Sequence, residues 1–168
     1  MIYIVMGVSG CGKSTIGAAL AEQLTCPFFD ADDFHPPENI AKMSNGQALN
    51  DEDRWPWLSL LADKIVDWQQ SGSAVLACSA LKQSYRDILS KNGESDVVFV
   101  YLAGTREVIY NRLEQRKGHF MAADLLQSQF DTLEVPVNYT GMSSVITVDI
   151  DQSTNAIVGE VFSAIRTR

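Results

Sequence analysis

Eight residues near the start of the chain, Gly7-Val8-Ser9-Gly10-Cys11-Gly12-Lys13-Ser14, fit the pattern G-x-x-x-x-G-K-[ST] at every defined position. The pattern is typical of a loop whose glycines let backbone N–H groups surround a phosphate. Lys13 supplies a mobile cation, and Ser14 offers a hydroxyl to Mg²⁺ at the start of a helix. We therefore expect a site for the phosphates of a nucleotide; a glycine-rich turn without ligand is the alternative. The residues expected at this site are Gly7, Ser9, Gly10, Cys11, Gly12, Lys13 and Ser14.

Two carboxylates, Asp30 and Asp32, end the second apolar run of the chain. In open α/β sheets, ligands bind outside the carboxyl ends of the strands, and alternate residues of a strand point in opposite directions. We expect Asp30 to face Mg²⁺ and its bound water, and Asp32 to orient, and to deprotonate, the attacking hydroxyl of an acceptor. Aspartates that only form a turn at the strand end are the alternative.

A cluster of cations, Arg112, Arg116, Lys117 and His119, stands out in an acidic chain. Arg112 and Arg116 are four residues apart on one predicted helix face, and no acidic residue lies three or four positions from either. This pattern favours an anionic ligand, with one arginine against the nucleotide and another closing on the transferred phosphate. A solvated basic face remains the alternative.

Three further positions have two interpretations each. His35 lies close to the aspartate pair and either contributes to the site or satisfies a helix N-terminus. Arg54 can hold a substrate carboxylate with two hydrogen bonds or can pair with the acidic residues before it. Residues 78–82 follow the third predicted strand on the ligand side, where Ser79 either faces the ligand or caps the next helix.

Apolar runs and helical periodicity alternate along the chain, which predicts an α/β fold with a parallel, doubly wound sheet covered by helices on both faces. We expect one domain, 1–168. The predicted strands are 2–6, 27–30, 74–78, 97–102 and 145–150, and the predicted helices are 13–24, 54–70, 80–91, 105–116 and 153–166.

The start of the predicted helix 54–70 has a readable signal. With Asp53 as N-cap, Pro56 occupies the third helical position, where its missing N–H has no partner within the helix. Asn50 as the cap would place this proline too deep. Two segments do not fit the minimal alternation: we expect 31–54 to bind substrate and 117–139 to form a mobile lid.

Composition restricts the class of protein further. The 168 residues carry a formal charge of −8, which argues against broad binding to nucleic acid or to an anionic membrane. The three cysteines show no metal-type spacing, and one lies inside the phosphate loop, which favours a reducing compartment. No basic leader or run of 18 apolar residues is visible, so we expect a cytoplasmic protein.

These residues together resemble the gluconate kinase family, small P-loop sugar-acid kinases related to shikimate and nucleoside monophosphate kinases. The matching blocks follow the family order over nearly the whole chain. They include Asp30-Ala31-Asp32-Asp33-Phe34-His35-Pro36, Leu49-Asn50-Asp51-Glu52-Asp53-Arg54, Cys78-Ser79-Ala80-Leu81-Lys82, Arg116-Lys117-Gly118-His119-Phe120 and Gln129-Phe130-Asp131-Thr132-Leu133-Glu134.

The resemblance implies a P-loop kinase fold and ATP-dependent phosphorylation of D-gluconate to 6-phosphogluconate with Mg²⁺, usually in a homodimer. It implies that Thr15 joins the loop residues at ATP and Mg²⁺, that Asp32 contacts the acceptor hydroxyl, and that Arg112 and Arg116 serve the nucleotide and lid. Catalysis would rest on Lys13, Asp32 and Arg116. The sugar acid would meet Asp32, His35, Arg54, Ser79 and Lys82.

Two other functions compete with this one. A shikimate kinase shares the phosphate loop, the D-x-D pair and a substrate arginine, but typically has a glycine-rich turn where this chain has residues 78–82. A P-loop GTPase switch, a signalling protein rather than a metabolic enzyme, would carry N-K-x-D and D-x-x-G motifs. Neither motif stands at its expected place.

Overall fold

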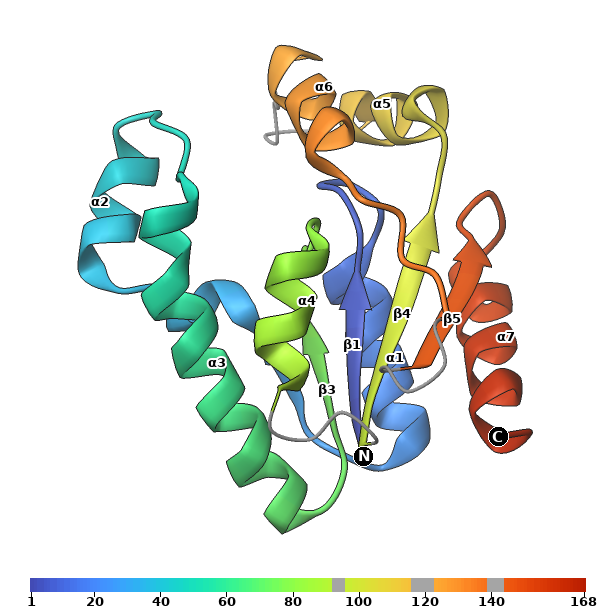
Figure 1. Ribbon diagram of the computed structural model, residues 1–168. Coiled ribbons are helices and arrows are strands. Elements are labelled where there is room, and N and C mark those ends of the chain that lie inside the picture. The colour runs from blue at the N-terminus through green and yellow to red at the C-terminus, as the bar shows by residue number, and fades with distance from the viewer. Residues whose placement is uncertain (92–95, 116–122, 139–143) are drawn as a thin grey trace.

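A five-stranded parallel sheet lies between two layers of helices in the computed structural model, which describes residues 1–91, 96–115, 123–138 and 144–168 (Figure 1). The elements are β1 (Ile2–Met6), α1 (Lys13–Leu24), β2 (Phe28–Asp30), the 3-10 helix η1 (Ala31–Phe34), α2 (Pro37–Ser44), α3 (Asp51–Ser71), β3 (Ala74–Ala77), α4 (Gln83–Ser90), β4 (Val97–Ala103), α5 (Arg106–Gln115), α6 (Ala123–Thr132), β5 (Ser144–Asp149) and α7 (Thr154–Arg166). No helix of these ranges is long and apolar enough to cross a membrane.

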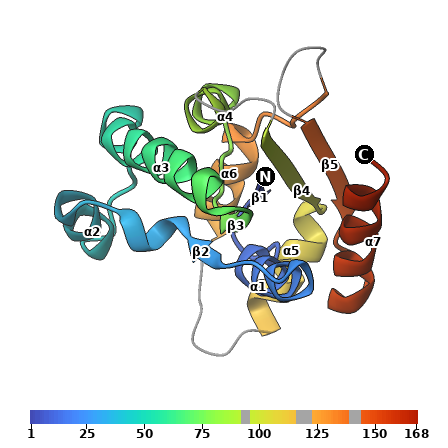
Figure 2. The same ribbon diagram turned by 90° about the horizontal axis from the view of Figure 1, so that it is seen from below.

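The strand order is β2-β3-β1-β4-β5, so β1 is central and is covered on both faces. Along β1, Tyr3 and Val5 point into one hydrophobic core, whereas Ile2, Ile4 and Met6 point into the other. Strand alternation with apolar residues at every position therefore produces two cores from one short run. Helices α1 and α7 cover one face, and α3 and α4 cover the other, as Figure 2 shows from below.

The predicted strands and the parallel α/β architecture are confirmed. No strand begins or ends more than one residue from its predicted position. The predicted start of α3 is wrong. Asn50 is the N-cap, its Oδ1 accepts from the Asp53 N–H (2.8 Å), and Asp53 Oδ2 accepts from the Asn50 N–H (2.9 Å). Pro56 consequently lies inside the helix. These two capping bonds offset the one helical bond that the proline cannot make.

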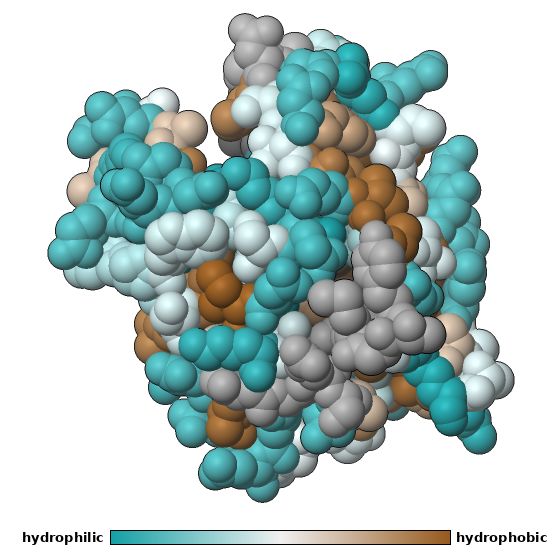
Figure 3. Space-filling model, viewed as in Figure 1, coloured by the Kyte–Doolittle hydropathy of each residue, from teal (hydrophilic) through white to brown (hydrophobic). Residues whose placement is uncertain are grey.

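The parallel sheet brings the ends of β1, β2 and β3 to one edge. Because β3 lies between the other two, the loop after it contacts the phosphate loop directly: the Gly7 N–H donates to the Ser79 carbonyl (3.3 Å). Figure 3 shows one face of the molecule, which is notched at this end, between the α2–α3 lobe and the α5–α6 lobe. The predicted chemistry therefore gathers beside an indentation of the surface.

Candidate active site

The phosphate loop has the backbone conformation that its glycines predict. Gly10 and Gly12 have φ of +83° and +99°, a region that residues with a Cβ rarely adopt. A Cβ on Gly10 would also lie 2.9 Å from Leu113 of α5, so the loop packs closely under that helix. Lys13 turns back and donates to the Val8 carbonyl (3.1 Å). Its ammonium group thus already lies over the loop that would hold phosphate.

Other loop residues contribute in different ways. Cys11 is fully buried, so only its backbone faces the phosphate position, and burial raises the pKa of its thiol. Ser14 and Thr15 are exposed in the first turn of α1, where both hydroxyls are accessible to a ligand. The helix carries no acidic residue in this turn, and its N-terminus remains favourable for an anion.

Asp30 connects the phosphate loop with the second aspartate. Its Oδ2 accepts from the Ser14 hydroxyl (3.0 Å), and its Oδ1 accepts from the Asp32 N–H (3.0 Å). One carboxylate therefore fixes the predicted Mg²⁺ hydroxyl and also the backbone that carries Asp32. The prediction that Asp30 and Asp32 meet the loop at one edge of the sheet agrees with this geometry.

Asp32 presents its carboxylate to the site. Its side chain is 85% exposed in the absence of ligand, at the turn where β2 becomes η1. Partial desolvation by the surrounding protein, together with the negative charge of Asp30, raises the pKa of Asp32, although His35 and Lys13 oppose this effect. The result is an accessible carboxylate of increased basicity, as a proton acceptor requires.

His35 is a buried side chain next to the carboxylate of Asp32. Its side chain is only 5% exposed, its ring stacks on Trp57 at 4.1 Å, and its Nε2 lies 3.8 Å from Asp32 Oδ1. The Asn39 amide contacts its Nδ1 at 3.3 Å. Burial lowers the pKa of His35, and Arg54 adds to this effect. Its ring nitrogens contact the side chains of Asp32 and of Asn39, which lies in the first turn of α2; among the described residues, no backbone N–H of that turn donates to the ring.

Arg54 and Lys82 both lie near Tyr85, each with its charged group 5.5 Å from the centre of the ring. Arg54 donates to the Tyr85 hydroxyl (2.9 Å), this hydroxyl donates to Asp51 (2.5 Å), and Lys82 donates to both oxygens of Asp51 (3.1 and 3.2 Å). Within the described ranges, Arg54 makes no ion pair with the acidic residues before it, which was one of the two sequence interpretations. The group has two cations and one carboxylate, so it can accept a second carboxylate from a ligand.

The loop after β3 is held by a buried arginine. Arg86 is 2% exposed and donates to the carbonyls of Ala80 (2.7 Å), Leu81 (3.2 Å) and Glu134 (2.8 Å). Ala80 has φ of +44°, which is strained for a residue with a Cβ. Lys82 is the N-cap of α4, so the alternative that Ser79 caps this helix is wrong.

Only part of the predicted lid, 117–139, lies within the described residues. Arg112 extends from α5 and donates to the Ile150 carbonyl after β5. Arg116, Lys117 and His119 lie outside the described residues, as do most positions of the first half of the predicted lid. The second half is hydrogen-bonded to the body of the protein. Gln129 of α6 makes hydrogen bonds with Ser9, and the Glu134 N–H donates to the Leu81 carbonyl.

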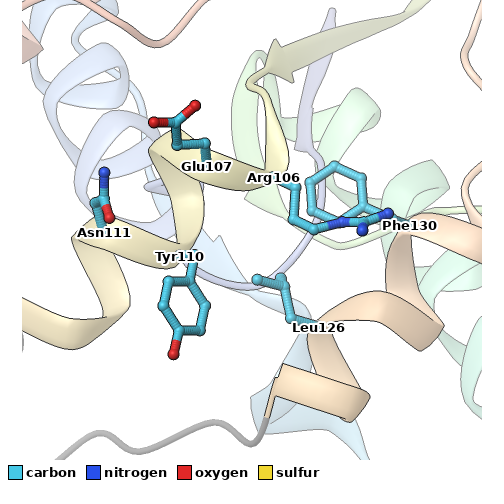
Figure 4. Close-up of a pocket in the computed structure, with 6 residues that line it drawn as sticks. All are labelled: Arg106, Glu107, Tyr110, Asn111, Leu126 and Phe130. Carbon is cyan, nitrogen blue, oxygen red and sulfur yellow. The ribbon is translucent and has the colours of Figure 1, made fainter.

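A separate pocket of about 650 Å³ lies between α5 and α6. In Figure 4, Arg106 extends towards Phe130, and Leu126 lies below both; the guanidinium lies 5.8 Å from the centre of the Phe130 ring. The lining residues, Arg106, Glu107, Tyr110, Asn111, Leu126 and Phe130, include none of the predicted site residues. The pocket is therefore distinct from the aspartate site.

The donor atoms suit Mg²⁺ held jointly with a nucleotide. No group of three or more His, Cys, Asp or Glu side chains in the described ranges forms a complete metal site. Mg²⁺ usually keeps several water molecules and binds one or two protein oxygens together with substrate phosphates. The Ser14 hydroxyl and the Asp30 carboxylate, 3.0 Å apart, match that requirement.

Several residues of the site were not singled out in the sequence. Tyr85 and Asp51 complete the cationic group, Asn39 contacts His35, and Gln129 reaches the phosphate loop across 120 positions. Tyr85 follows Lys82 by one helical turn, a spacing that could have indicated their contact. Nothing in the local sequence pairs Gln129 with Ser9.

Comparisons with known proteins identify the family of this chain. Residues 9–166 match the shikimate kinase family. The chain is 46% identical over 182 residues to a probable gluconokinase of Mus musculus, covering 98% of this chain and 97% of that one. It is 43% identical over 166 residues to the thermoresistant gluconokinase of Escherichia coli (strain K12), covering 98% and 93%.

Solved structures give the same result. The crystal structure of a gluconokinase from Sinorhizobium meliloti 1021 superposes with a TM-score of 0.87 at 43% identity, covering 98% of this chain and 91% of that one. A shikimate kinase from Aquifex aeolicus vf5 has a TM-score of 0.61 at 15% identity, which shows a common fold. The chain therefore belongs to the shikimate kinase family of P-loop kinases and, within that family, to the gluconokinases.

Proposed function

We propose that this kinase transfers the terminal phosphoryl group of ATP to D-gluconate and releases ADP and 6-phosphogluconate. The observation that carries the proposal is the arrangement of Asp30, which binds Ser14 of the phosphate loop and the backbone of the exposed Asp32. In this arrangement Asp32 would serve as a proton acceptor next to the phosphate loop. The 40–48% identity to gluconokinases over most of the chain supports gluconate over shikimate as the acceptor.

The phosphate loop binds and orients the nucleotide. Its backbone N–H groups and the N-terminus of α1 attract the phosphates, and Lys13 exchanges its contact with the Val8 carbonyl for a phosphate oxygen. Ser14 would be a direct protein ligand for Mg²⁺, and Asp30 would hold water bound to the ion. When bound, Mg²⁺ supplies positive charge to the phosphoryl oxygens.

Asp32 orients the acceptor hydroxyl. The hydroxyl oxygen of gluconate forms the new bond to phosphorus, the bond from phosphorus to the ADP oxygen breaks, and the hydroxyl proton passes to Asp32. His35 and Asp30 keep this carboxylate in position from two sides. Because the phosphoryl transition state is largely dissociative, orientation of the hydroxyl contributes alongside the basicity of the carboxylate.

The cationic group of Arg54 and Lys82 would bind the carboxylate of gluconate. Arg54 keeps guanidinium N–H groups beyond the one that it donates to Tyr85, and these can form two parallel bonds to a carboxylate. Residues 31–54 supply both this arginine and Asp32, which supports the prediction of a substrate-binding segment. Ser79 would line the same side of the site.

The remaining assignments concern the setting of the enzyme. The free thiols of Cys11, Cys26 and Cys78 support a cytoplasmic location. The homodimer rests on the family resemblance. The roles of Arg112 at the nucleotide and of Arg116 in closing on the transferred phosphate rest on this resemblance and on the charge pattern. Sedimentation velocity would test the dimer.

A coupled assay of ADP release tests the central proposal. The purified protein with ATP and Mg²⁺ should turn over gluconate at least a hundredfold faster than shikimate or nucleoside monophosphates. GTP binding with no sugar-dependent ADP release would instead support a switch protein. Equal rates with all acceptors would contradict the assignment of gluconate.

A further inference from the structure

The side chain of Gln129 makes two hydrogen bonds to one residue of the phosphate loop. Its Oε1 accepts from the Ser9 backbone N–H (2.7 Å), and its Nε2 donates to the Ser9 hydroxyl oxygen (2.9 Å). Ser9 lies in the phosphate loop, just before α1, whereas Gln129 lies on α6. This contact joins two parts of the fold that are 120 positions apart in the chain.

The donor and acceptor chemistry fixes the direction of both bonds. A backbone N–H can only donate, so the amide oxygen must face it and the amide nitrogen must face the hydroxyl. The Ser9 hydroxyl therefore accepts a bond from Gln129, and its own proton is left to point elsewhere. Among the residues that the structure describes, this hydroxyl donates to no protein atom.

Gln129 is held firmly enough to impose this direction. Leu126, one turn earlier on α6, is 1% exposed in the core, and just after the helix the Glu134 N–H donates to the Leu81 carbonyl (2.8 Å). Arg86 binds the Glu134 carbonyl from the other side. The helix is thus anchored on both sides of the glutamine.

We propose that Gln129 is a positioning residue that keeps the Ser9 hydroxyl proton directed at the phosphates of the bound nucleotide. Phosphate oxygens only accept hydrogen bonds, so a serine whose proton is already committed to a protein acceptor cannot bind them. This inference rests on the proposed kinase function only in naming a nucleoside triphosphate as the ligand. Ser9 is the group that touches the ligand, and Gln129 acts through it.

Replacement of Gln129 by Glu separates this role from a structural one. A carboxylate can accept from both the Ser9 N–H and the Ser9 hydroxyl, so Gln129→Glu keeps two contacts between α6 and the loop but reverses the hydroxyl. Gln129→Met removes both contacts and leaves the hydroxyl free to rotate. Gln127→Leu is a matched control on the same helix, because it removes only a local bond to Asp131 (2.6 Å).

The measurement is calorimetric titration with a non-hydrolysable ATP analogue and Mg²⁺, without gluconate, together with thermal unfolding of each variant. Ser9→Ala should weaken binding about tenfold in the wild-type background, as expected for a bond to a charged acceptor. In the Gln129→Glu background, Ser9→Ala should change affinity less than twofold, because the hydroxyl there no longer donates to the ligand. Gln129→Met should lower the unfolding temperature more than Gln129→Glu but bind the analogue more tightly.

The double-mutant comparison also cancels the effect of the added negative charge, which is present in both members of the Gln129→Glu pair. An equal loss from Ser9→Ala in both backgrounds would overturn the proposal, and so would wild-type affinity in the Gln129→Glu protein. Since gluconate is absent from this titration, failure of the wild-type protein to phosphorylate gluconate would refute the proposed function alone.

Discussion

The Ser14 hydroxyl and the Asp30 carboxylate meet at 3.0 Å, and this contact links the start of α1 to the end of β2. The other oxygen of Asp30 holds the backbone of Asp32. A single short side chain therefore sets the distance between the predicted metal position and the predicted proton acceptor. Movement of either partner would change the metal position and the acceptor position together.

Replacement of Asp30 should act mainly through Mg²⁺. Asp30→Ala removes the acceptor for Ser14 and for water bound to the ion, so the Mg²⁺ concentration for half-maximal activity should rise about 10- to 100-fold, the usual range for loss of an outer carboxylate. Activity would be measured as a function of Mg²⁺ at saturating ATP. Asp33→Ala is the control, since Asp33 is exposed in the same 3-10 helix; an equal shift there would contradict the assignment.

Replacement of Asp32 should act on turnover. Asp32→Asn keeps the size of the side chain but cannot accept the hydroxyl proton, so kcat should fall by roughly 10²- to 10⁴-fold, the range for loss of a general base. The free energy of unfolding should change by less than about 0.5 kcal/mol, because the side chain is 85% exposed. Steady-state kinetics and urea unfolding check both parts. Near-normal kcat would remove Asp32 from the mechanism.

Much of the fold could be predicted because its signals are local. Continuous apolar runs identified all five strands, and the glycines of the phosphate loop identified the turn into α1. The start of α3 was not predicted correctly, because Pro56 disfavours Asn50 as the N-cap on local grounds, whereas the capping box at Asn50 and Asp53 stabilises that start. The reciprocal bonds of Asn50 and Asp53, reinforced by Lys42 at 2.6 Å, start the helix three residues earlier.

The site was predictable where one segment carries it and was missed where distant segments meet. Asp30 and Asp32 follow one strand, and their position follows from the edge of the sheet. By contrast, Tyr85 reaches Arg54 across 31 positions, and Gln129 reaches Ser9 across 120. Such contacts depend on how side chains of distant segments pack, and this packing leaves no periodic pattern in the sequence.

Arg54 should govern affinity for the sugar acid. Arg54→Lys keeps the charge but loses the planar pair of donors, so the KM for gluconate should rise about tenfold or more with little change in the KM for ATP. Arg106→Lys is a suitable control, because that guanidinium lies over Phe130 in the separate pocket. A reduced kcat with unchanged KM would instead place Arg54 at the transferred phosphate.

The pair of Asp51 and Lys82 should contribute stability within a defined pH window. Hydrogen bonds from Tyr85 and Lys82 lower the pKa of Asp51 below its usual 3.8, and the bond to Asp51 raises the pKa of Lys82 above 10.5. The contribution of Asp51 is therefore complete above its unfolded value and is lost as pH falls through the folded value. The contribution of Lys82 is lost as pH rises through its own folded value.

Urea unfolding of the wild-type protein and of Asp51→Asn, measured from pH 2 to pH 8, tests this window. The difference in the free energy of unfolding should be constant near neutral pH and should vanish at the acidic end. Asp63→Asn provides an exposed control on the same helix. A difference that grows on acidification would have the wrong sign and would exclude the pairing as its cause.

Arg86 should be a sensitive position for stability. Its buried guanidinium satisfies three backbone carbonyls and holds the strained Ala80 turn against the segment after α6. Arg86→Met would leave the Ala80 and Glu134 carbonyls without this donor, whereas the Leu81 carbonyl keeps its bond from the Glu134 N–H. The free energy of unfolding should therefore fall by about 3 kcal/mol. Arg166→Met, which changes an exposed guanidinium over Phe162, should change it by less than about 0.5 kcal/mol. Equal losses from the two substitutions, measured by urea unfolding, would show that burial of Arg86 is not what stabilises the loop.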